Sequence, residues 1–270
     1  MKKWLWIALG LSLFVAGIKA YPTISMLMAN TPPEPVNLSQ VNVMAELQEE
    51  AQKKGSLDYL ILGDSVAMGQ GSEKKQGYPA LVAKRLKKEH IPLLLHNEGV
   101  SGRTSQQMLQ ALDTPAMQKK IRNAELISLT IGGNDLLKVA LNEKNPVQAI
   151  TAFGDIQKNY QRNLKETLSK VRLLNPDAPI LLTSLYNPIS PAEPYYDLSN
   201  TLLDKWNIGM KEVAYQFPST LVIDVDEKLQ AGQGSWLADA IHPNDRGYQR
   251  IADGILEGMR EARPAAASTQ

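Results

Sequence analysis

The 270-residue sequence contains no cysteine, which excludes disulfide bonds and thiolate metal sites. It also lacks an excess of charge, since 29 Lys and Arg stand against 28 Asp and Glu. Nucleic acid binding depends on clustered Lys and Arg, so nucleic acid is not an expected partner. The three histidines have no paired spacing of the kind that metal ligands show. We therefore expect no metal and no other cofactor.

The longest apolar stretch lies at the amino terminus. Lys2 and Lys3 precede an uncharged apolar run at residues 4–18, which is typical of segments that enter the export machinery. Residues 1–28 are interpreted as a signal peptide or an amino-terminal membrane anchor. The anchor is preferred, because apolar residues continue past Lys19 and extend the run to the roughly 20 residues that span a bilayer. The protein is thus expected outside the cytoplasm, membrane-anchored or secreted.

Residues 29–55 have the composition of a spacer followed by a lead-in helix. The segment Thr31-Pro32-Pro33-Glu34-Pro35 is typical of an extended linker rather than of a core. Residues 41–54 carry apolar side chains at helical spacing and predict an amphipathic helix that ends at Gly55. The main folded domain is expected over residues 56–262, followed by a frayed tail at 263–270.

Short apolar runs alternate with longer amphipathic stretches from Ser56 onward, a pattern typical of βαβ units on a parallel sheet. The sequence therefore predicts an α/β fold. Strands are predicted at residues 59–62, 92–95, 126–131, 180–184 and 221–225. Helices are predicted at residues 78–90, 105–111, 156–174, 202–217 and 244–262. The proline-rich stretch between Tyr186 and Tyr196 is predicted to be a loop that walls one side of a site.

The first strand of the domain ends abruptly in Gly63-Asp64-Ser65. Because parallel strands present reactive side chains at their carboxyl ends, Ser65 is the candidate nucleophile. The surrounding residues do not form the Gly-x-Ser-x-Gly elbow of the α/β-hydrolases, and no Walker phosphate loop follows. Asp64 is interpreted as structural. Taken alone, the tripeptide also fits an ordinary connection between a strand and a turn.

His242 is the candidate general base. Asp239, three residues earlier, can accept a hydrogen bond from Nδ1 and leave Nε2 free to deprotonate a serine. Asn244 can cap the final helix. His90 is interpreted as a solvated helix end and His96 as a structural residue at a strand end.

Two segments after strands offer donors for a developing oxyanion. Gly102, in a loop after a strand, lets a backbone N–H approach a ligand closely. Asn134 follows a buried strand, and its side-chain amide can donate to the same charge. Asp135 is predicted to cap a helix that begins near Leu136. Each segment also fits a plain turn or cap when taken alone.

Together these segments resemble the SGNH hydrolases, also called the GDSL esterase/lipase family. The resemblance rests on four motif blocks in family order and covers roughly residues 56–262. The blocks are Gly63-Asp64-Ser65, Gly102, Gly132-Gly133-Asn134-Asp135 and Asp239-x-x-His242. The one departure is Val66, where the family has Leu. The resemblance implies a three-layer α/β/α sandwich with a mostly parallel, flavodoxin-like sheet of about five strands.

The resemblance also implies a role for each residue. Ser65 is the expected nucleophile, His242 the general base and Asp239 the residue that orients the base. The N–H groups of Ser65 and Gly102 and the side chain of Asn134 are the expected oxyanion hole.

The sequence thus predicts an extracytoplasmic serine esterase or lipase that forms an acyl-enzyme on Ser65. Two substrate classes stay open, namely lipid acyl esters and the O-acetyl groups of cell-wall polysaccharide. A large apolar cleft would favour the lipid esters. Tyr186, Tyr195 and Tyr196 suit either class, since aromatic rings pack on sugars and on acyl chains. A non-catalytic wall- or lipid-binding module is the less favoured alternative, because a binder has no need of a nucleophile, a base and oxyanion donors together.

Overall fold

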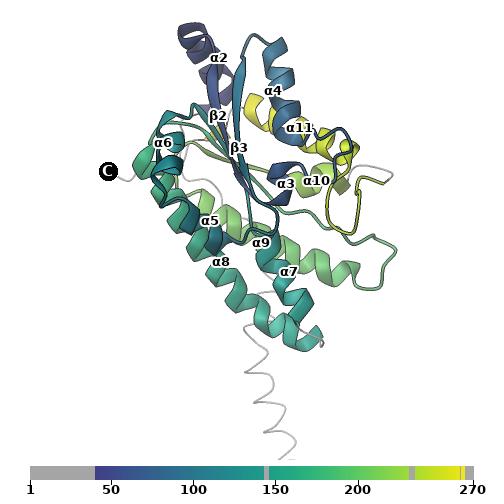
Figure 1. Ribbon diagram of the computed structural model, residues 1–270. Coiled ribbons are helices and arrows are strands. Elements are labelled where there is room, and N and C mark those ends of the chain that lie inside the picture. The colour runs from purple at the N-terminus through teal and green to yellow at the C-terminus, as the bar shows by residue number, and fades with distance from the viewer. Residues whose placement is uncertain (1–39, 143–145, 231–234, 262, 265–270) are drawn as a thin grey trace, which may run out of the picture.

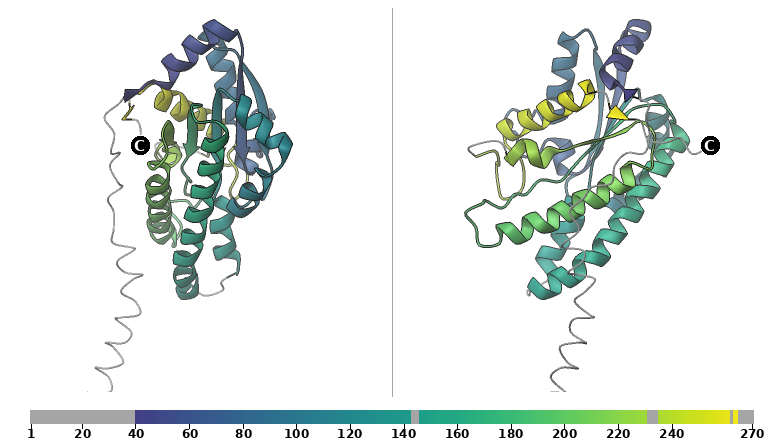
Figure 2. Two further views of the ribbon diagram at one scale, coloured as in Figure 1. Left: turned by 90° about the vertical axis from the view of Figure 1, so that its left-hand side faces the viewer. Right: turned by 180° about the vertical axis from the view of Figure 1, so that it is seen from behind.

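The computed structural model describes residues 40–142, 146–230, 235–261 and 263–264. Its centre is a five-stranded parallel sheet with the order β3-β2-β4-β5-β6. The strands are β2 (Leu57–Gly63), β3 (Leu93–Gly99), β4 (Leu126–Thr130), β5 (Ile180–Thr183) and β6 (Thr220–Ile223). Helices cover both faces of this sheet (Figures 1 and 2). The predicted three-layer α/β/α sandwich is therefore confirmed.

Two cores, one on each face, hold the sheet between its helix layers. Along β2, Leu60 and Leu62 point into one core, and Tyr59 and Ile61 point into the other. All four side chains are fully buried, because a central parallel strand has helices on both faces. This is why β2 is an almost continuous apolar run in the sequence.

The helices divide into two groups by the core they line. One face carries α5 (Ser105–Ala111), α6 (Pro115–Asn123), α7 (Gly133–Asn142), α8 (Pro146–Leu174) and α9 (Tyr196–Ala214). The other face carries α2 (Val43–Lys54), α3 (Ser65–Met68), α4 (Tyr78–Lys88), α10 (Val225–Gln230) and α11 (Asp245–Arg260). Figure 2 shows the two layers from the side and from behind.

The strand order reverses between β2 and β4. From β2 the chain passes through α4 on one face to β3, and from β3 it returns through α5 and α6 on the other face to β4. The connections therefore diverge at the carboxyl ends of β2 and β4, which is where open α/β sheets leave a crevice for ligands. Ser65 follows β2 and Asn134 follows β4, so both candidate residues lie at this crevice.

Several helix boundaries differ from the sequence prediction. α8 begins at Pro146 instead of 156, and α9 begins at Tyr196 instead of 202. The prediction followed apolar spacing, which is weak in the polar first turn of α9. Helix α6 was not predicted, although Thr114 caps the amide of Met117 and Pro115 is the first helical residue, a common way for a helix to begin.

The ends of the domain lie side by side. The strand β1 (Gln40–Val41) pairs antiparallel with β7 (Arg263–Pro264), where the sequence predicted a helix from residue 41 and a frayed tail from 263. The helix α2 instead begins at Val43, and Asn42 caps it by accepting from the amide of Ala45 at 3.1 Å. No helix within the described ranges is long and apolar enough to span a membrane. The predicted signal or anchor, residues 1–28, lies outside the described residues.

Candidate active site

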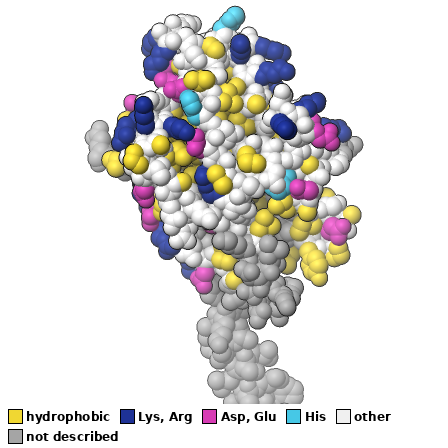
Figure 3. Space-filling model, in the orientation of Figure 1, with side chains coloured by type: hydrophobic (Ala, Val, Ile, Leu, Met, Phe, Trp, Pro, Cys, Tyr) yellow, Lys and Arg dark blue, Asp and Glu magenta, His cyan; other side chains and the backbone are white. Residues whose placement is uncertain are grey.

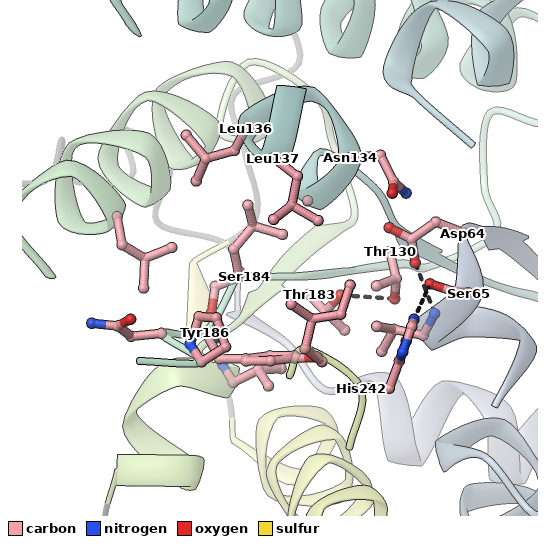
Figure 4. Close-up of a pocket in the computed structure, with 18 of the residues that line it drawn as sticks. Asp64, Ser65, Thr130, Asn134, Leu136, Leu137, Thr183, Ser184, Tyr186 and His242 are labelled. Carbon is pink, nitrogen blue, oxygen red and sulfur yellow. Dashed lines mark hydrogen bonds between the residues drawn. The ribbon is translucent and has the colours of Figure 1, made fainter. Parts of the chain in front are cut away.

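A tight strand end presents Ser65. Gly63 adopts φ +154°, and a Cβ there would lie 2.4 Å from the carbonyl oxygen of Thr130 on β4. Only glycine therefore lets the two strands close in this way. Asp64 then caps α3, since its Oδ1 accepts from the amide of Val66 at 2.9 Å. Ser65 becomes the first residue of α3, and its side chain points into the crevice (Figure 4).

The structure brings Ser65, His242 and Asp239 into one hydrogen-bonded chain. Ser65 Oγ lies 3.0 Å from His242 Nε2, and His242 Nδ1 lies 2.8 Å from Asp239 Oδ2. The serine and the histidine are buried, whereas the carboxylate of Asp239 is about half exposed, with 51% of its side-chain surface accessible. Nδ1–H donating to Asp239 leaves Nε2 as the acceptor for the serine hydroxyl, which is the arrangement that activates a nucleophile.

Residues 235–244, here named the catalytic loop, hold Asp239 and His242. The amide of Ala238 donates to the carbonyl of His242 at 2.8 Å, which closes the loop on itself. Asn244 caps α11 as predicted, with Oδ1 accepting from the amides of Arg246 and Gly247 at 2.9 and 3.0 Å. The loop is thus fixed at the start of α11, whose inner face is buried.

Two carboxyl groups at the site have opposite shifts in pKa. The amides of Ile241 and His242, and then the His242 side chain, donate to Asp239 and lower the pKa of its carboxyl to about 2. Burial raises the pKa of Asp64 to about 6, against the amides that bind it. Asp239 is therefore a fixed negative partner for His242 at neutral pH. Asp64 caps α3, which agrees with the prediction that it is a structural residue.

The candidate oxyanion donors come from the ends of β2, β3 and β4. Gly102 adopts φ +76° in the turn after β3, and the Nδ2 of Asn134 donates to the carbonyl of Arg103 at 2.9 Å. This bond ties the turn of Gly102 to the cleft, which Asn134 lines beside Ser65 (Figure 4). Within the described ranges, neither the N–H of Ser65 nor that of Gly102 donates to another group of the chain.

Asp135 has a different role from the one predicted. It lies inside the first turn of α7, which begins at Gly133, and its carboxylate accepts from the amide and the hydroxyl of Ser105 at 2.8 and 2.7 Å. Asp135 therefore contacts the start of α5, where free amides favour a negative charge. The predicted cap near Leu136 was wrong because the cap partner is 30 residues away in the sequence, which spacing cannot reveal.

An apolar cleft of about 260 Å³ leads away from Ser65 and His242. Leu136 and Leu137 of α7 lie along one side and Tyr186 lies on the other (Figure 4). Further apolar lining residues are Phe153, Leu185, Ile189, Leu202, Leu203, Val225, Ile241 and Ile251. Figure 3 also shows hydrophobic side chains at the lower right of the surface, where Figure 1 shows the loop between β5 and α9. The reactive end is thus polar, and most of the remaining lining is apolar.

The other two histidines lie away from this cleft. His96 Nε2 lies 2.9 Å from Asp58 Oδ1, and His90 is exposed with φ +63° after α4. In the described part of the chain, no group of three His, Cys, Asp or Glu side chains is arranged to hold a metal.

Sequence reasoning missed the leucines of the cleft and Tyr78. The Tyr78 hydroxyl lies 2.9 Å from Thr130 Oγ1 and 3.2 Å from Ser128 Oγ, at the base of the cleft. The adjacent Leu136 and Leu137, directly after the Gly-Gly-Asn-Asp block, were a signal for an apolar wall. Nothing local marked Tyr78, because its partners are 50 residues or more away.

Comparison with curated proteins finds relatives that include a lipase and an esterase. The chain is 28% identical over 230 residues to the spore germination lipase LipC of Bacillus licheniformis, covering 75% of this chain and all of that one. It is 27% identical over 209 residues to the esterase TesA of Pseudomonas aeruginosa, covering 77% and 90%. It is also 26% identical over 231 residues to the uncharacterized protein YpmR of Bacillus subtilis, covering 83% and 90%.

Solved structures agree with these relatives. The lipase Lip_vut3 from a goat rumen metagenome superposes with a TM-score of 0.65 at 25% identity, over 76% of this chain and 98% of that one. A variant of Axe2, an acetyl-xylooligosaccharide esterase from a Geobacillus species, has a TM-score of 0.59 at 19% identity, over 75% and 94%, and supports the fold alone. The model of the GDSL-like Lipase/Acylhydrolase family matches residues 61–250. Since that match spans well over half of the chain, the protein belongs to the GDSL-like lipase/acylhydrolase family and is a carboxylic ester hydrolase.

Proposed function

We propose that this protein is a serine esterase that hydrolyses acyl esters through an acyl-enzyme on Ser65, with His242 as general base. The observation that carries this proposal is the distance of 3.0 Å between Ser65 Oγ and His242 Nε2 at the mouth of an apolar cleft. A nucleophile and a base within hydrogen-bond distance, with the base oriented by a third group, are what acyl transfer requires.

The reaction proceeds in two steps. Ser65 Oγ attacks the ester carbonyl while His242 Nε2 takes the serine proton, and His242 then gives that proton to the leaving alcohol. A water molecule next attacks the acyl-enzyme, with His242 again as base. Asp239 holds the imidazole in the required tautomer, and its hydrogen bond of 2.8 Å to Nδ1 strengthens as positive charge develops on the ring.

The N–H groups of Ser65 and Gly102 and the amide of Asn134 stabilise the oxyanion. Donors that already face the developing charge need no rearrangement in the transition state, which makes them effective in catalysis. Two features support this assignment. The N–H of Ser65 lies at the start of α3, where backbone amides have no helical partner, and Gly102 has no side chain that blocks an approaching ligand.

The cleft favours esters of a medium-length acyl chain over acetyl esters. A cleft of about 260 Å³ is several times the roughly 30 Å³ that one water molecule takes up in the liquid, so it has room for an acyl chain well beyond acetyl. An acetyl group would leave most of its apolar lining in contact with water. Of the two substrate classes that the sequence left open, lipid acyl esters are thus preferred over wall polysaccharide O-acetyl groups.

The site of action is also a proposal, and it rests on residues 1–28. Two lysines followed by an apolar run favour export and anchoring, so the enzyme acts outside the cytoplasm. A fusion of the full chain to alkaline phosphatase tests this, because that reporter is active only after export. Active fusions support the proposal, and fusions that are inactive although the protein accumulates contradict it.

Hydrolysis of the p-nitrophenyl esters of acetate, butyrate, octanoate and palmitate tests the function, with the Ser65→Ala variant alongside. We expect kcat/KM to peak at octanoate, and Ser65→Ala to lower kcat by about 10⁴-fold or more. Labelling by a serine-directed phosphonate should disappear in the same variant. A maximum at acetate would contradict the acyl-chain assignment alone, whereas labelling and hydrolysis that survive Ser65→Ala would mean another nucleophile.

A further inference from the structure

Tyr186 contacts both the apolar cleft and the catalytic loop. It follows β5, and its ring lines the apolar cleft. Its hydroxyl donates to the carbonyl of Ile241 at 2.6 Å, across 55 positions of sequence. Ile241 directly precedes His242, and the Ile241 amide donates to Asp239 Oδ1 at 2.9 Å. The phenol is therefore hydrogen-bonded to Ile241, one of the two residues between Asp239 and His242.

The ring of Tyr186 contacts a second part of the catalytic loop. It packs edge-to-face on Trp236, with ring centroids 5.1 Å apart and an interplanar angle of 88°. The carbonyl of Trp236 accepts from the amide of Asn244 at 2.9 Å, where the loop enters α11. The ring of Tyr186 thus contacts the catalytic loop near its start, and the hydroxyl binds the loop next to His242.

The backbone on both sides of Tyr186 is fixed. The buried Asn207 of α9 bonds both the amide and the carbonyl of Leu185, at 3.0 and 2.9 Å. The amide of Asn187 donates to the buried carboxylate of Asp226 at 2.9 Å. A side chain that starts from such a rigid segment can set the position of the loop to which it binds.

The phenol is also a constant donor. Burial, followed by the nearby Tyr248, Asp64 and Asp239, raises the pKa of Tyr186 well above its ordinary value. The hydroxyl therefore keeps its proton, and can donate to the carbonyl of Ile241, at neutral and mildly alkaline pH.

We infer that Tyr186 is a positioning residue for His242, acting through Ile241, as well as a wall of the acyl cleft. This inference rests on the proposed function, since it assigns His242 as the base. The hydroxyl aligns Nε2 with Ser65 Oγ, while the ring contacts the acyl chain. Removing the hydroxyl then slows the reaction for every ester, and removing the ring weakens the binding of long acyl chains in addition.

Tyr186→Phe tests the role of the hydroxyl. Because the ring stays, KM for the acetate and octanoate esters should remain within twofold. The kcat for both esters should fall about tenfold, because a small displacement of His242 slows the chemical step. The rate constant of phosphonate labelling should fall by a similar factor, since labelling also needs the base. Rates are divided by the number of sites that the phosphonate titrates, so that loss of folded protein does not count as loss of kcat.

Tyr215→Phe is the matched control, because Tyr215 follows α9 and lies outside the cleft and the catalytic loop. We expect its kcat and its labelling rate to stay within twofold of the wild type. Tyr186→Leu separates the two roles, and should add a rise of at least fivefold in KM for octanoate with little change for acetate.

A Tyr186→Phe enzyme with a lower melting temperature but the wild-type kcat per titrated site would overturn the inference. The bond from the Tyr186 hydroxyl to Ile241 would then contribute to stability alone. A fall in kcat confined to octanoate would overturn it too, since that result assigns the hydroxyl to acyl binding. Failure of the proposed function has a different signature, namely wild-type protein with no hydrolysis or labelling that depends on Ser65.

Discussion

Two asparagines at opposite ends of the strands use the same side chain in different ways. Asn175 lies before β5, at the amino ends of the strands, and is buried. Its Nδ2 donates to the carbonyls of Ile121 and Ala124 at 2.7 and 2.8 Å, and its Oδ1 accepts from the amide of Ala178 at 3.0 Å. Asn134 lies after β4, at the carboxyl ends, and within the described ranges it makes a single side-chain hydrogen bond, to Arg103.

The difference shows that side chains at the amino ends of the strands stabilise the fold, whereas those at the carboxyl ends are available for chemistry. At the amino ends, both the Nδ2 and the Oδ1 of Asn175 bond to backbone groups of the chain. These bonds close the turn between α8 and β5. At the carboxyl ends, the described residues give no acceptor to the N–H groups of Ser65 and Gly102, and the bond to Arg103 uses one of the two Nδ2 hydrogens of Asn134. A donor of this kind beside a cleft is available to a substrate. Substitutions at the two ends should therefore affect different measured quantities.

Exchanging the two asparagines for alanine gives the largest expected contrast. Asn134→Ala should lower kcat by about 10² to 10³ if its amide stabilises the oxyanion, with little loss of stability. Asn175→Ala removes the side-chain partners of the Ile121 and Ala124 carbonyls and of the Ala178 amide, and should lower the free energy of unfolding by about 2–4 kcal/mol, with kcat per titrated site within twofold. Urea unfolding measures the free energy of unfolding, and active-site titration gives the number of sites by which the rate is divided to obtain kcat. A change in kcat under about threefold for Asn134→Ala would remove that residue from the oxyanion hole.

This division explains which parts of the molecule were predictable from sequence. The central strands were predictable because a strand buried on both faces is rich in apolar residues, as at residues 59–62 of β2. The positions of Ser65 and Asn134 followed, since each comes directly after such a run. Their meeting at one crevice is a consequence of parallel topology, which alternating strands and helices already indicate.

Contacts between distant segments were not predictable in this way. The hydroxyl of Tyr186 reaches Ile241, and the carboxylate of Asp135 reaches Ser105, through geometry that no local pattern encodes. The cleft is likewise assembled from α7, α9 and the β5–α9 loop, whose apolar residues look like ordinary core positions when each segment is read alone. Tertiary packing decides which of them face a cavity.

The buried carboxyl of Asp64, at the carboxyl ends of the strands, makes the stability of the protein depend on pH. Burial raises its pKa from the ordinary 3.8 to about 6, so its ionisation opposes folding. The protonated form is favoured in the folded state, and this contribution to stability is present below pH 3.8 and is lost as the pH rises to about 6. The shift corresponds to at most about 3 kcal/mol.

Asp64→Asn removes this titration. Its free energy of unfolding should match the wild type near pH 4 and exceed it above pH 6, because the variant has no buried charge to form. Urea unfolding from pH 4 to pH 8 measures the difference. Parallel curves for the two proteins would mean that Asp64 is ionised in the folded state throughout this range.

The acyl end of the cleft can be altered separately from the reactive end. Leu137 lies on α7, on the side of the cleft opposite Tyr186 (Figure 4). Leu137→Trp should fill the apolar part of the cleft and lower kcat/KM for octanoate about thirtyfold, which is about 2 kcal/mol, with acetate within threefold. The ratio of the two specificity constants is the measurement. An equal fall for both esters would mean that the substitution disturbs Ser65 or His242 and not acyl binding.

The smallest expected effect belongs to the amino ends of the strands. Thr220 begins β6, and its hydroxyl donates to the carbonyl of Pro218 at 3.3 Å and accepts from Arg172 Nη2 at 3.4 Å. Both bonds are long, and Arg172 Nη2 keeps a shorter bond of 3.0 Å to the carbonyl of Ser219. Thr220→Val should therefore lower the free energy of unfolding by less than about 1 kcal/mol and leave kcat unchanged. A measurable fall in kcat per titrated site would break the division, because it would mean that the amino ends of the strands also set the geometry of the active site.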